Sequence, residues 1–230
     1  MNLLIQKMGS SKQEEYRFDV HRRFKKVEGF CSKNRENLKT KAIQTLEGRG
    51  CQVFLAANAE KVANIIAEIV QSARIVISKD PLLEALGLPE KLLERGVITI
   101  CTNEERFVPG KINEVRVLVR KEIASATFGL TGVQAVVANH GSLVLMDEQG
   151  SIHSISALPF THIAVASVQQ IVPDLVEAMT VVRFASLQRT VRKLMRYISI
   201  ITGPSSTSDI EGKNVRGMHG PQEVYVILVE

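Results

Sequence analysis

Residues 201–211 read ITGPSSTSDIE, a stretch in which hydroxyl side chains and backbone amides gather next to two carboxylates. Free N–H groups beside Gly203, together with the neighbouring hydroxyls, are suited to binding a phosphate or a carboxylate. Asp209 and Glu211 would repel such an anion unless they point away from it, hold a cation or transfer protons. The stretch therefore contains the donors of an anion site and two groups that could carry acid–base chemistry.

The same residues also fit a surface turn that binds nothing. Ser208 and Glu211 have the S-x-x-E spacing of a capping box, and clusters of Ser, Thr and Gly are typical of turns. Composition alone favours this alternative. However, the preceding run YISI (197–200) is strand-like. If that strand belongs to an open α/β sheet and ends at Gly203, the stretch lies at the sheet's carboxyl edge, where such sheets bind ligands.

Two histidines lie in glycine-containing loops, where they could take part in proton transfer. His219 precedes Gly220, and His140 precedes Gly141 in the run NHG. A loop histidine is also commonly solvated, and His140 suits a turn residue with positive φ. His162 starts a strand-like run, so we expect it to pack or cap unless it faces a cleft. The remaining two histidines have no supporting context.

Two well-known catalytic and cofactor motifs do not fit the sequence. Ser142 is not flanked by the G-x-S-x-G pattern of a nucleophile elbow. The run GLTG, which includes Thr131 and Gly132, is only a weak G-x-x-G. It precedes a strand-like run, whereas a dinucleotide-binding fingerprint follows a strand.

The patterns over residues 51–126 predict βαβ crossovers and a parallel sheet. Apolar runs of strand length alternate there with runs of helical spacing. Strands are predicted at 51–57, 74–78 and 97–101, and helices at 58–70, 80–86, 89–96 and 113–130. Asn58 is well placed to cap the first of these helices.

The second half of the chain is richer in strands. Two apolar runs around NHG, within residues 132–146, predict a hairpin. Further strands are predicted at 151–158, 162–167, 197–203 and 223–229, and a long helix at 174–196. Ahead of the first strand, the pattern from about Glu14 to Leu46 is helical, with a break expected at Gly29.

These patterns predict an α/β fold with two parts. Residues 51–230 are expected to form one domain, an open and largely parallel mixed sheet with helices on both faces. Residues 1–50 are expected to form a helical basic arm on its outside. A length of 230 residues and 45% hydrophobic residues suit a chain with a sizeable core.

The basic charge of the chain is confined to the arm. The net charge of the whole chain is +5, while residues 1–50 alone carry +6 and the remainder −1. A basic arm could bind phosphate groups of a nucleic acid. Because no aromatic residues are interleaved and no nucleic-acid reading motif is present, a solvated amphipathic helix is favoured instead.

Three widely spaced cysteines, Cys31, Cys51 and Cys101, exclude a C-x-x-C motif. We therefore expect no zinc or iron–sulfur site built from this chain alone, and no other metal or cofactor of its own. Free cysteines fit the reducing cytoplasm. No apolar run reaches the ~18 residues of a membrane span, and the N-terminus lacks the pattern of an export signal.

The last third of the chain resembles a known family. The run GPSSTSDIE followed by GMHGP and a final strand resembles the closing segment of the lactate utilisation protein C family, which carries a LUD domain. LTGVQAVVANHGSLVLMDEQG resembles that family's hairpin, and LPFTHIAVASVQQIVPDLVEAM its next strand and helix. The resemblance covers about residues 51–230 and is faint over the arm.

The resemblance implies a fold of the ribose-phosphate isomerase and CoA-transferase type. It also implies a role in oxidising L-lactate to pyruvate beside cysteine-rich iron–sulfur partner proteins, with the clusters in those partners. A homo-oligomer is also possible. Two other functions are kept open: an independent enzyme acting on a sugar phosphate or a CoA ester, and a nucleic-acid or regulatory protein acting through residues 1–50.

The resemblance favours a ligand site over a bare turn at the opening stretch. The family's hairpin commonly reads E-T-G-T, whereas this chain has NHGS, so an amide replaces the family's carboxylate. His219, Glu211, Asp209 and His140 are the predicted catalytic residues. The predicted contacts to a small anionic ligand are Thr131, Gly132, Asn139, Gly141, Ser142, Gly203, Pro204, Ser205, Ser206, Thr207 and Gly220.

Overall fold

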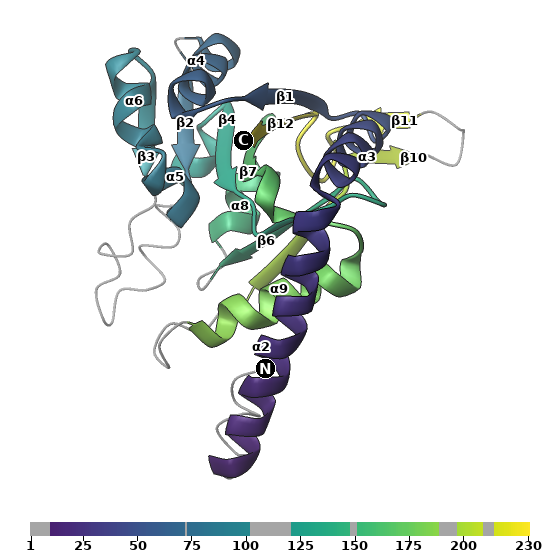
Figure 1. Ribbon diagram of the computed structural model, residues 1–230. Coiled ribbons are helices and arrows are strands. Elements are labelled where there is room, and N and C mark those ends of the chain that lie inside the picture. The colour runs from purple at the N-terminus through teal and green to yellow at the C-terminus, as the bar shows by residue number, and fades with distance from the viewer. Residues whose placement is uncertain (1–9, 72, 102–120, 148–150, 189–196, 209–213) are drawn as a thin grey trace.

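Six parallel strands form the central sheet of the protein in a computed structural model (Figure 1). The structure describes residues 10–71, 73–101, 121–147, 151–188, 197–208 and 214–230. Across the sheet the strands follow the order β1, β12, β7, β4, β2, β3, and every adjacent pair is parallel. Their bounds are β1 (Gln52–Ala56), β2 (Arg74–Ile77), β3 (Ile98–Cys101), β4 (Phe128–Gly132), β7 (Thr161–Ser167) and β12 (Glu223–Val229). The predicted α/β fold with a largely parallel sheet is confirmed.

A second, four-stranded sheet contains the predicted hairpin. Its order is β8 (Ile171–Val172), β5 (Ala135–Val137), β6 (Ser142–Asp147) and β9 (Tyr197–Ile201). β5 and β6 pair antiparallel around the NHG turn, as predicted, and β9 pairs antiparallel with β6. A short ribbon of β10 (Ser206–Ser208) and β11 (Asn214–Arg216) follows. The strand before Gly203 is therefore an edge strand of the second sheet, and the expectation that it ends in the parallel sheet was wrong.

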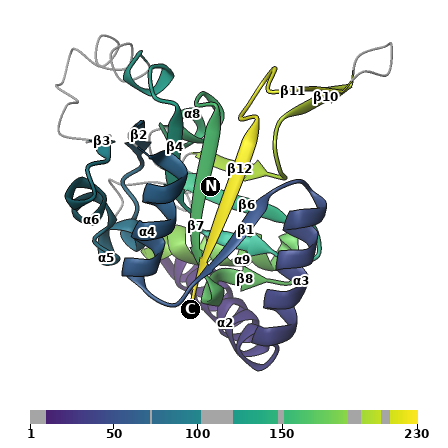
Figure 2. The same ribbon diagram turned by 90° about the horizontal axis from the view of Figure 1, so that it is seen from above.

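The parallel sheet is covered on both faces (Figure 2). One face carries α4 (Ala59–Val70), α5 (Pro81–Ala85) and α6 (Leu88–Glu94), and the other carries α8 (Ser151–Ala157) and the second sheet. Successive side chains of β7 point to opposite faces, so Ile163 packs among the helices while Ala164 packs toward the second sheet. α9 (Leu175–Gln188) covers β5 and β8 of the second sheet.

Most of the local predictions match the observed elements. The Asn58 side chain accepts a hydrogen bond from the Lys61 N–H at 2.9 Å and caps α4, as predicted. Residues 151–158 are one exception, because Ser151–Ala157 forms helix α8 where a strand was predicted. Ile152 and Ile155 are both buried and three residues apart, which is helical spacing.

The helix predicted at 113–130 extends too far. Residues 121–124 are helical, but Phe128–Gly132 forms β4, which pairs with both β2 and β7. The part of this prediction before residue 121 lies outside the described residues. The same holds for residues 189–196 of the long helix, of which α9 is the described part.

Two helices form the arm, α2 (Ser10–Lys33) and α3 (Arg35–Gly48). They meet at Asn34, whose φ of −112° and ψ of 18° leave the helical region, and not at the predicted Gly29. Gly29 lies on an exposed face of α2, where a glycine costs only about 1 kcal/mol and does not end a helix. α2 packs along α9, and the Phe24 ring stacks on Phe184 with a centroid distance of 3.8 Å.

α3 contributes directly to the core. Leu38, Ala42 and Leu46 repeat every fourth residue and are buried against the second sheet and the facing side of the parallel sheet. The division of the chain into an arm and a domain between residues 50 and 51 stays a prediction. However, these three side chains show that the arm is more than a surface attachment.

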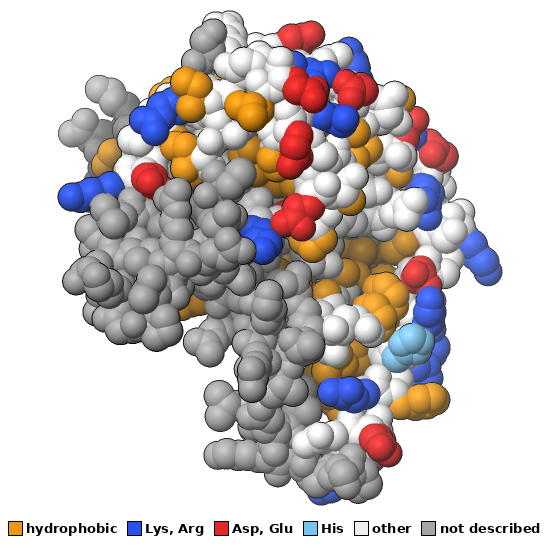
Figure 3. Space-filling view, turned by 90° about the vertical axis from the view of Figure 1, so that its left-hand side faces the viewer, with side chains coloured by type: hydrophobic (Ala, Val, Ile, Leu, Met, Phe, Trp, Pro, Cys, Tyr) orange, Lys and Arg blue, Asp and Glu red, His pale blue; other side chains and the backbone are white. Residues whose placement is uncertain are grey.

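Charges of both signs are interspersed on the face that includes α4 and α6 (Figure 3). Glu60 of α4 pairs with both Lys91 and Arg95 of the α6 region. On α2, Asp19 pairs with its neighbours Arg22 and Arg23, which partly neutralises the basic arm.

None of the described helices is both long enough and apolar enough to cross a membrane.

Leu46→Ala should test whether α3 belongs to the folded core. Because Leu46 is fully buried, we expect the change to lower the free energy of unfolding by about 2–5 kcal/mol. Leu93→Ala is the matched control, since Leu93 is 66% exposed and should cost well under 1 kcal/mol. Urea denaturation followed by circular dichroism measures both. Equal effects of the two changes would show that α3 is not part of the cooperative unit.

Candidate functional site

The two segments of the opening motif lie together at the amino edge of the parallel sheet. The Ser205 N–H donates to the Pro221 carbonyl at 2.8 Å, and the Gly217 N–H donates to the Ser205 carbonyl at 3.0 Å. The Gln222 N–H donates to the Phe160 carbonyl at 2.8 Å, immediately before β7 begins. The chain enters β12 at this edge. The predicted site therefore lies at the amino edge of the parallel sheet, whereas the carboxyl edge was expected.

A pocket of about 440 Å³ opens between β9, α8 and the segments 202–205 and 219–221. Four of the predicted site residues line it: Gly203, Ser205, His219 and Gly220. His153, Ser199 and Thr202 also line it, and sequence reasoning missed them. The helical spacing of Ile152 and Ile155 could have placed His153 on the exposed face of a helix beside them.

The polar groups of this pocket are loosely engaged. Ser199 Oγ lies 3.4 Å from His153 Nδ1, and the His219 N–H lies 3.4 Å from Ser205 Oγ. Both distances are at the long limit of a hydrogen bond, so the two hydroxyls keep capacity for a ligand. The described lining contains imidazoles and hydroxyls but no carboxylate, and such a set suits a small anion.

Glycines let the two loops approach their neighbours. Gly203 has a φ of +83°, and a Cβ there would collide with the Arg49 carbonyl oxygen. A Cβ on Gly220 would lie 3.1 Å from the Cβ of Ser205. The close approach to the end of α3 therefore requires glycine at position 203, while a side chain at position 220 would need Ser205 to shift by a few tenths of an ångström.

The NHG turn packs on α3 instead of lining the pocket. Gly141 has a φ of +63°, and a Cβ there would lie 2.6 Å from the Thr45 carbonyl oxygen. The Thr45 hydroxyl donates to the Ala138 carbonyl at 2.7 Å, and Arg49 Nε donates to the His140 carbonyl at 3.2 Å. The expectation that this turn shares a cleft with His219 was wrong, because the end of α3 occupies that position.

The side chains of the turn have other partners. His140 Nε2 lies 3.3 Å from Asp174 Oδ1. The Leu175 N–H and, secondarily, His140 and Asn139 hold the pKa of Asp174 below its usual range. Ser142 Oγ is 2.8 Å from Thr202 Oγ1, which links the turn to the strand end before Gly203. Ser142 is therefore the one residue of this turn whose side chain is hydrogen-bonded to a described residue of the pocket lining, Thr202.

Thr131 and Gly132 lie in β4, away from the pocket. Thr131 is fully buried, and its Oγ1 is 2.8 Å from Nε2 of His162, which is also fully buried. Burial lowers the pKa of His162 to about 3, so this imidazole is neutral at physiological pH. A Cβ on Gly132 would collide with the Asp80 carboxylate. Thr131 is therefore not accessible to a ligand in this fold.

The rest of the predicted site is only partly described. Asp209 and Glu211 lie outside the described residues. Ser206 is exposed at the start of β10, and Thr207 pairs through its backbone with Val215 of β11. Pro204 lies near Gly50, at the end of α3.

The two described thiols are poorly suited to hold a metal. Cys31 and Cys51 are free and buried. Burial raises the pKa of Cys51 to about 11, and burial together with the nearby Glu177 raises that of Cys31. Because the thiolate is the metal ligand, both side chains are unreactive near neutral pH. Within the described part of the chain, no three His, Cys, Asp or Glu side chains come together.

Residues 39–229 match the LUD domain family. Lactate utilization protein B of Geobacillus kaustophilus (strain HTA426) is 30% identical over 241 positions, which cover 85% of this chain and 49% of that protein. The protein of the same name from Bacillus subtilis (strain 168) is 24% identical, with 79% and 45% covered. The chain thus spans about half the length of the curated relatives it matches.

A solved structure has the same fold. The crystal structure of a DUF162 family protein from Deinococcus radiodurans superposes with a TM-score of 0.56 at 20% sequence identity. The match covers 85% of this chain and 98% of that chain. The α/β architecture is therefore found in a second protein of very different sequence.

His162→Gln should make the protein less sensitive to acid. Between pH 6.5 and about 3 the unfolded chain protonates this histidine and the folded protein does not, so stability falls as the pH is lowered. In that window the free energy of unfolding changes by up to ~1.4 kcal/mol per pH unit because of His162. Urea denaturation at pH 7, 6 and 5 should give a shallower decline for His162→Gln than for the parent. The control is His21→Gln on exposed α2, and a His162→Gln slope equal to the parent's would contradict the assignment.

Proposed function

Since the chain belongs to the LUD domain family, we propose that it serves lactate utilisation by binding a small anionic ligand in the pocket between β9 and α8. One observation carries the proposal. Four residues predicted from the motif, Gly203, Ser205, His219 and Gly220, meet at one pocket whose described lining has no carboxylate. Lactate and pyruvate are both small carboxylates, so the hydroxyls and imidazoles of this pocket are complementary to them.

The hydroxyl groups of the pocket would bind the ligand, and its imidazoles would transfer protons. The Ser199 and Ser205 hydroxyls would donate to the ligand carboxylate, because their present contacts are long. His153 of α8 and His219 of the loop before β12 both line the pocket and would exchange a proton with the ligand hydroxyl or carbonyl. Roles for Asp209 and Glu211 stay predictions, since these residues are not described.

The position of the chain within the family is also a proposal. The run GPSSTSDIE followed by GMHGP favours a protein of the C type, whereas the relatives that match are named protein B and are about twice as long. We propose a C-type chain that works in the cytoplasm with separate partners. Neighbouring genes that encode cysteine-rich proteins would support this, and fusion of the chain to a longer cysteine-rich protein would contradict it.

Oxidation of L-lactate to pyruvate releases two electrons and two protons, so an electron acceptor is required. We propose that iron–sulfur clusters in partner proteins accept the electrons. The buried, protonated Cys31 and Cys51 support this division, because neither is suited to ligate a cluster in this chain.

Ser205→Ala and His219→Gln should weaken ligand binding without unfolding the protein. Thermal shift with lactate, pyruvate, sugar phosphates and CoA esters identifies the ligand, and calorimetry then measures the variants. Loss of one charge-assisted hydrogen bond should cost about 1.5–3 kcal/mol of binding free energy. Ser154→Ala and His140→Gln are the controls, because neither side chain lines the pocket.

The same screen decides between the candidate functions. Binding of a small carboxylate that both pocket variants weaken supports the proposal. Unchanged binding in both variants would contradict the site. Turnover of a sugar phosphate or a CoA ester by the purified chain would instead support an independent enzyme.

Alkylation should confirm that the thiols are unsuited to metal binding. In a Cys101→Ser background at pH 7.5, we expect Cys31 and Cys51 to react with iodoacetamide at least ten times more slowly in the folded protein than in 6 M urea. Mass spectrometry of the labelled peptides measures each site. Equal rates in the two conditions would show that the thiols are accessible, and would reopen the question of a cluster in this chain.

A further inference from the structure

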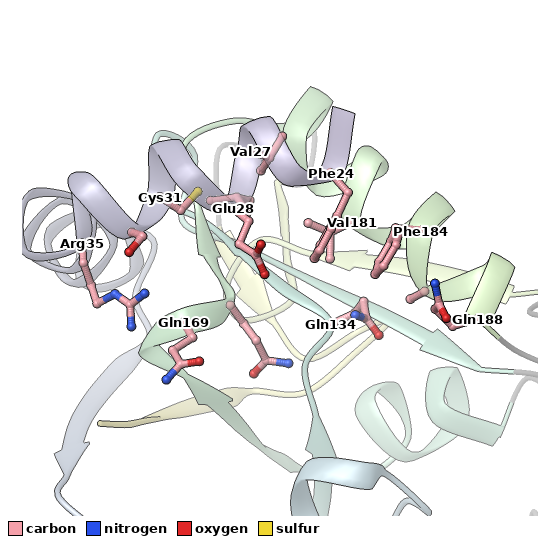
Figure 4. Close-up of a pocket in the computed structure, with 14 residues that line it drawn as sticks. Phe24, Val27, Glu28, Cys31, Arg35, Gln134, Gln169, Val181, Phe184 and Gln188 are labelled. Carbon is pink, nitrogen blue, oxygen red and sulfur yellow. The ribbon is translucent and has the colours of Figure 1, made fainter. Parts of the chain in front are cut away.

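A second pocket, of about 560 Å³, lies where α2 runs beside α9 (Figure 4). Gln134 follows β4, and Gln169 and Gln170 follow β7, so the ends of two neighbouring parallel strands meet there. The carboxyl ends of parallel strands are where open α/β sheets bind ligands. The wall formed by α2 precedes residue 39, where the family match begins, so this part of the pocket lies outside the matched domain.

The floor of the pocket is rigidly built. Gln170 belongs to the short 3₁₀ helix η2 (Val168–Gln170), and its Oε1 accepts from the Ser167 N–H at 2.7 Å. Its Nε2 donates to the Val133 carbonyl at 2.6 Å. One amide thus ties the ends of β4 and β7 together and is not available to a ligand.

Other polar groups of the lining remain unpaired. The amides of Gln134, Gln169 and Gln188 and the Arg35 guanidinium form no side-chain hydrogen bond or ion pair within the described residues. Arg35 is half-buried at one end of the pocket, near Gln169 (Figure 4). The pocket therefore offers amide donors, amide acceptors and one cation to a guest.

The opposite end of the pocket holds its aromatic side chains, beside Gln188 (Figure 4). Phe24 of α2 stacks on Phe184 of α9 at an interplanar angle of 6°, and Val181 lies beside them (Figure 4). Between the two ends, Glu28 extends from α2 into the pocket (Figure 4). Lys25 Nζ donates to Glu28 Oε2 at 2.7 Å, and the second carboxylate oxygen of Glu28 would accept a hydrogen bond from a ring N–H or an amino group.

We propose that this pocket binds a mononucleotide. Amide side chains pair in two-point fashion with the donor and acceptor edge of a base, and the Glu28 carboxylate accepts from its amino or imino group. The phenylalanine pair and Val181 contact the apolar ring, and Arg35 binds the phosphate through its planar guanidinium. The volume is in the range of pockets that hold ligands of this size, about 300–1,000 Å³.

Calorimetry on the full chain with AMP, GMP, UMP and FMN tests the proposal directly. We expect at least one of these to bind with a dissociation constant in the micromolar range. Arg35→Gln removes the phosphate contact, and Gln134→Leu removes a base contact. Each should weaken binding about 10- to 100-fold, as loss of a strong polar contact does.

Matched controls separate this pocket from other basic or polar surfaces. Arg17→Gln changes an exposed arginine of α2, away from the pocket, and Gln52→Leu changes an exposed glutamine of β1, so both should bind as the parent does. Ser205→Ala should also bind the nucleotide normally, because Ser205 lines the other pocket. If lactate does not bind to the pocket between β9 and α8, the nucleotide test of the pocket between α2 and α9 is therefore unaffected.

Three outcomes would overturn the proposal. The first is the absence of heat or thermal shift with all four nucleotides at 1 mM. The second is binding that Arg35→Gln and Gln134→Leu leave unchanged, which would place the nucleotide elsewhere. The third is equal affinity for inorganic phosphate and for the nucleotide, which would show an anion site without base recognition.

Discussion

Covering both faces of the parallel sheet is the constraint on which the rest of the structure depends. Buried strands such as β7 have apolar side chains on both sides, so each face needs a layer of its own. Helices α4, α5 and α6 supply one layer. The hairpin β5–β6 with β8 and β9 supplies most of the other and is itself covered by α9 and the buried side of α3. Because the hairpin covers the parallel sheet, it does not extend it. β9 pairs with β6 of this hairpin, so β9 and the following Gly203 lie with the second sheet.

That arrangement separates two kinds of site. The motif loops gather at the amino edge of the parallel sheet, where β7 and β12 begin, and the α2–α9 pocket lies near the ends of β4 and β7. The first pocket is built from hydroxyls and imidazoles, and the second from amides, one carboxylate and one guanidinium. Their different linings are complementary to different guests, so a ligand of one pocket has little reason to compete for the other.

Local patterns in the sequence were enough to predict most elements, but not their partners. Asn58, the helix after it and the hairpin around Gly141 were predictable because capping and turn formation depend on a few adjacent residues. The position of Gly203 was not, because it depends on the pairing of β9 with β6, which is distant in sequence. Ser205 and His219 were predicted as neighbours from the motif, and both line one pocket. Thr131 lies elsewhere, and nothing in a short window of sequence shows that its hydroxyl is buried against His162.

The place of β12 in the sheet has a consequence for how the chain folds. β12 lies between β1 and β7, and β1 pairs with no other strand in the described structure. During synthesis, β1 is therefore made long before the segment 223–229 that completes its hydrogen bonds. Its backbone groups and apolar side chains stay exposed through most of translation, and such a late, long-range closure is slow. Until β12 is made, the edge of β1 is therefore open to pairing with other strands.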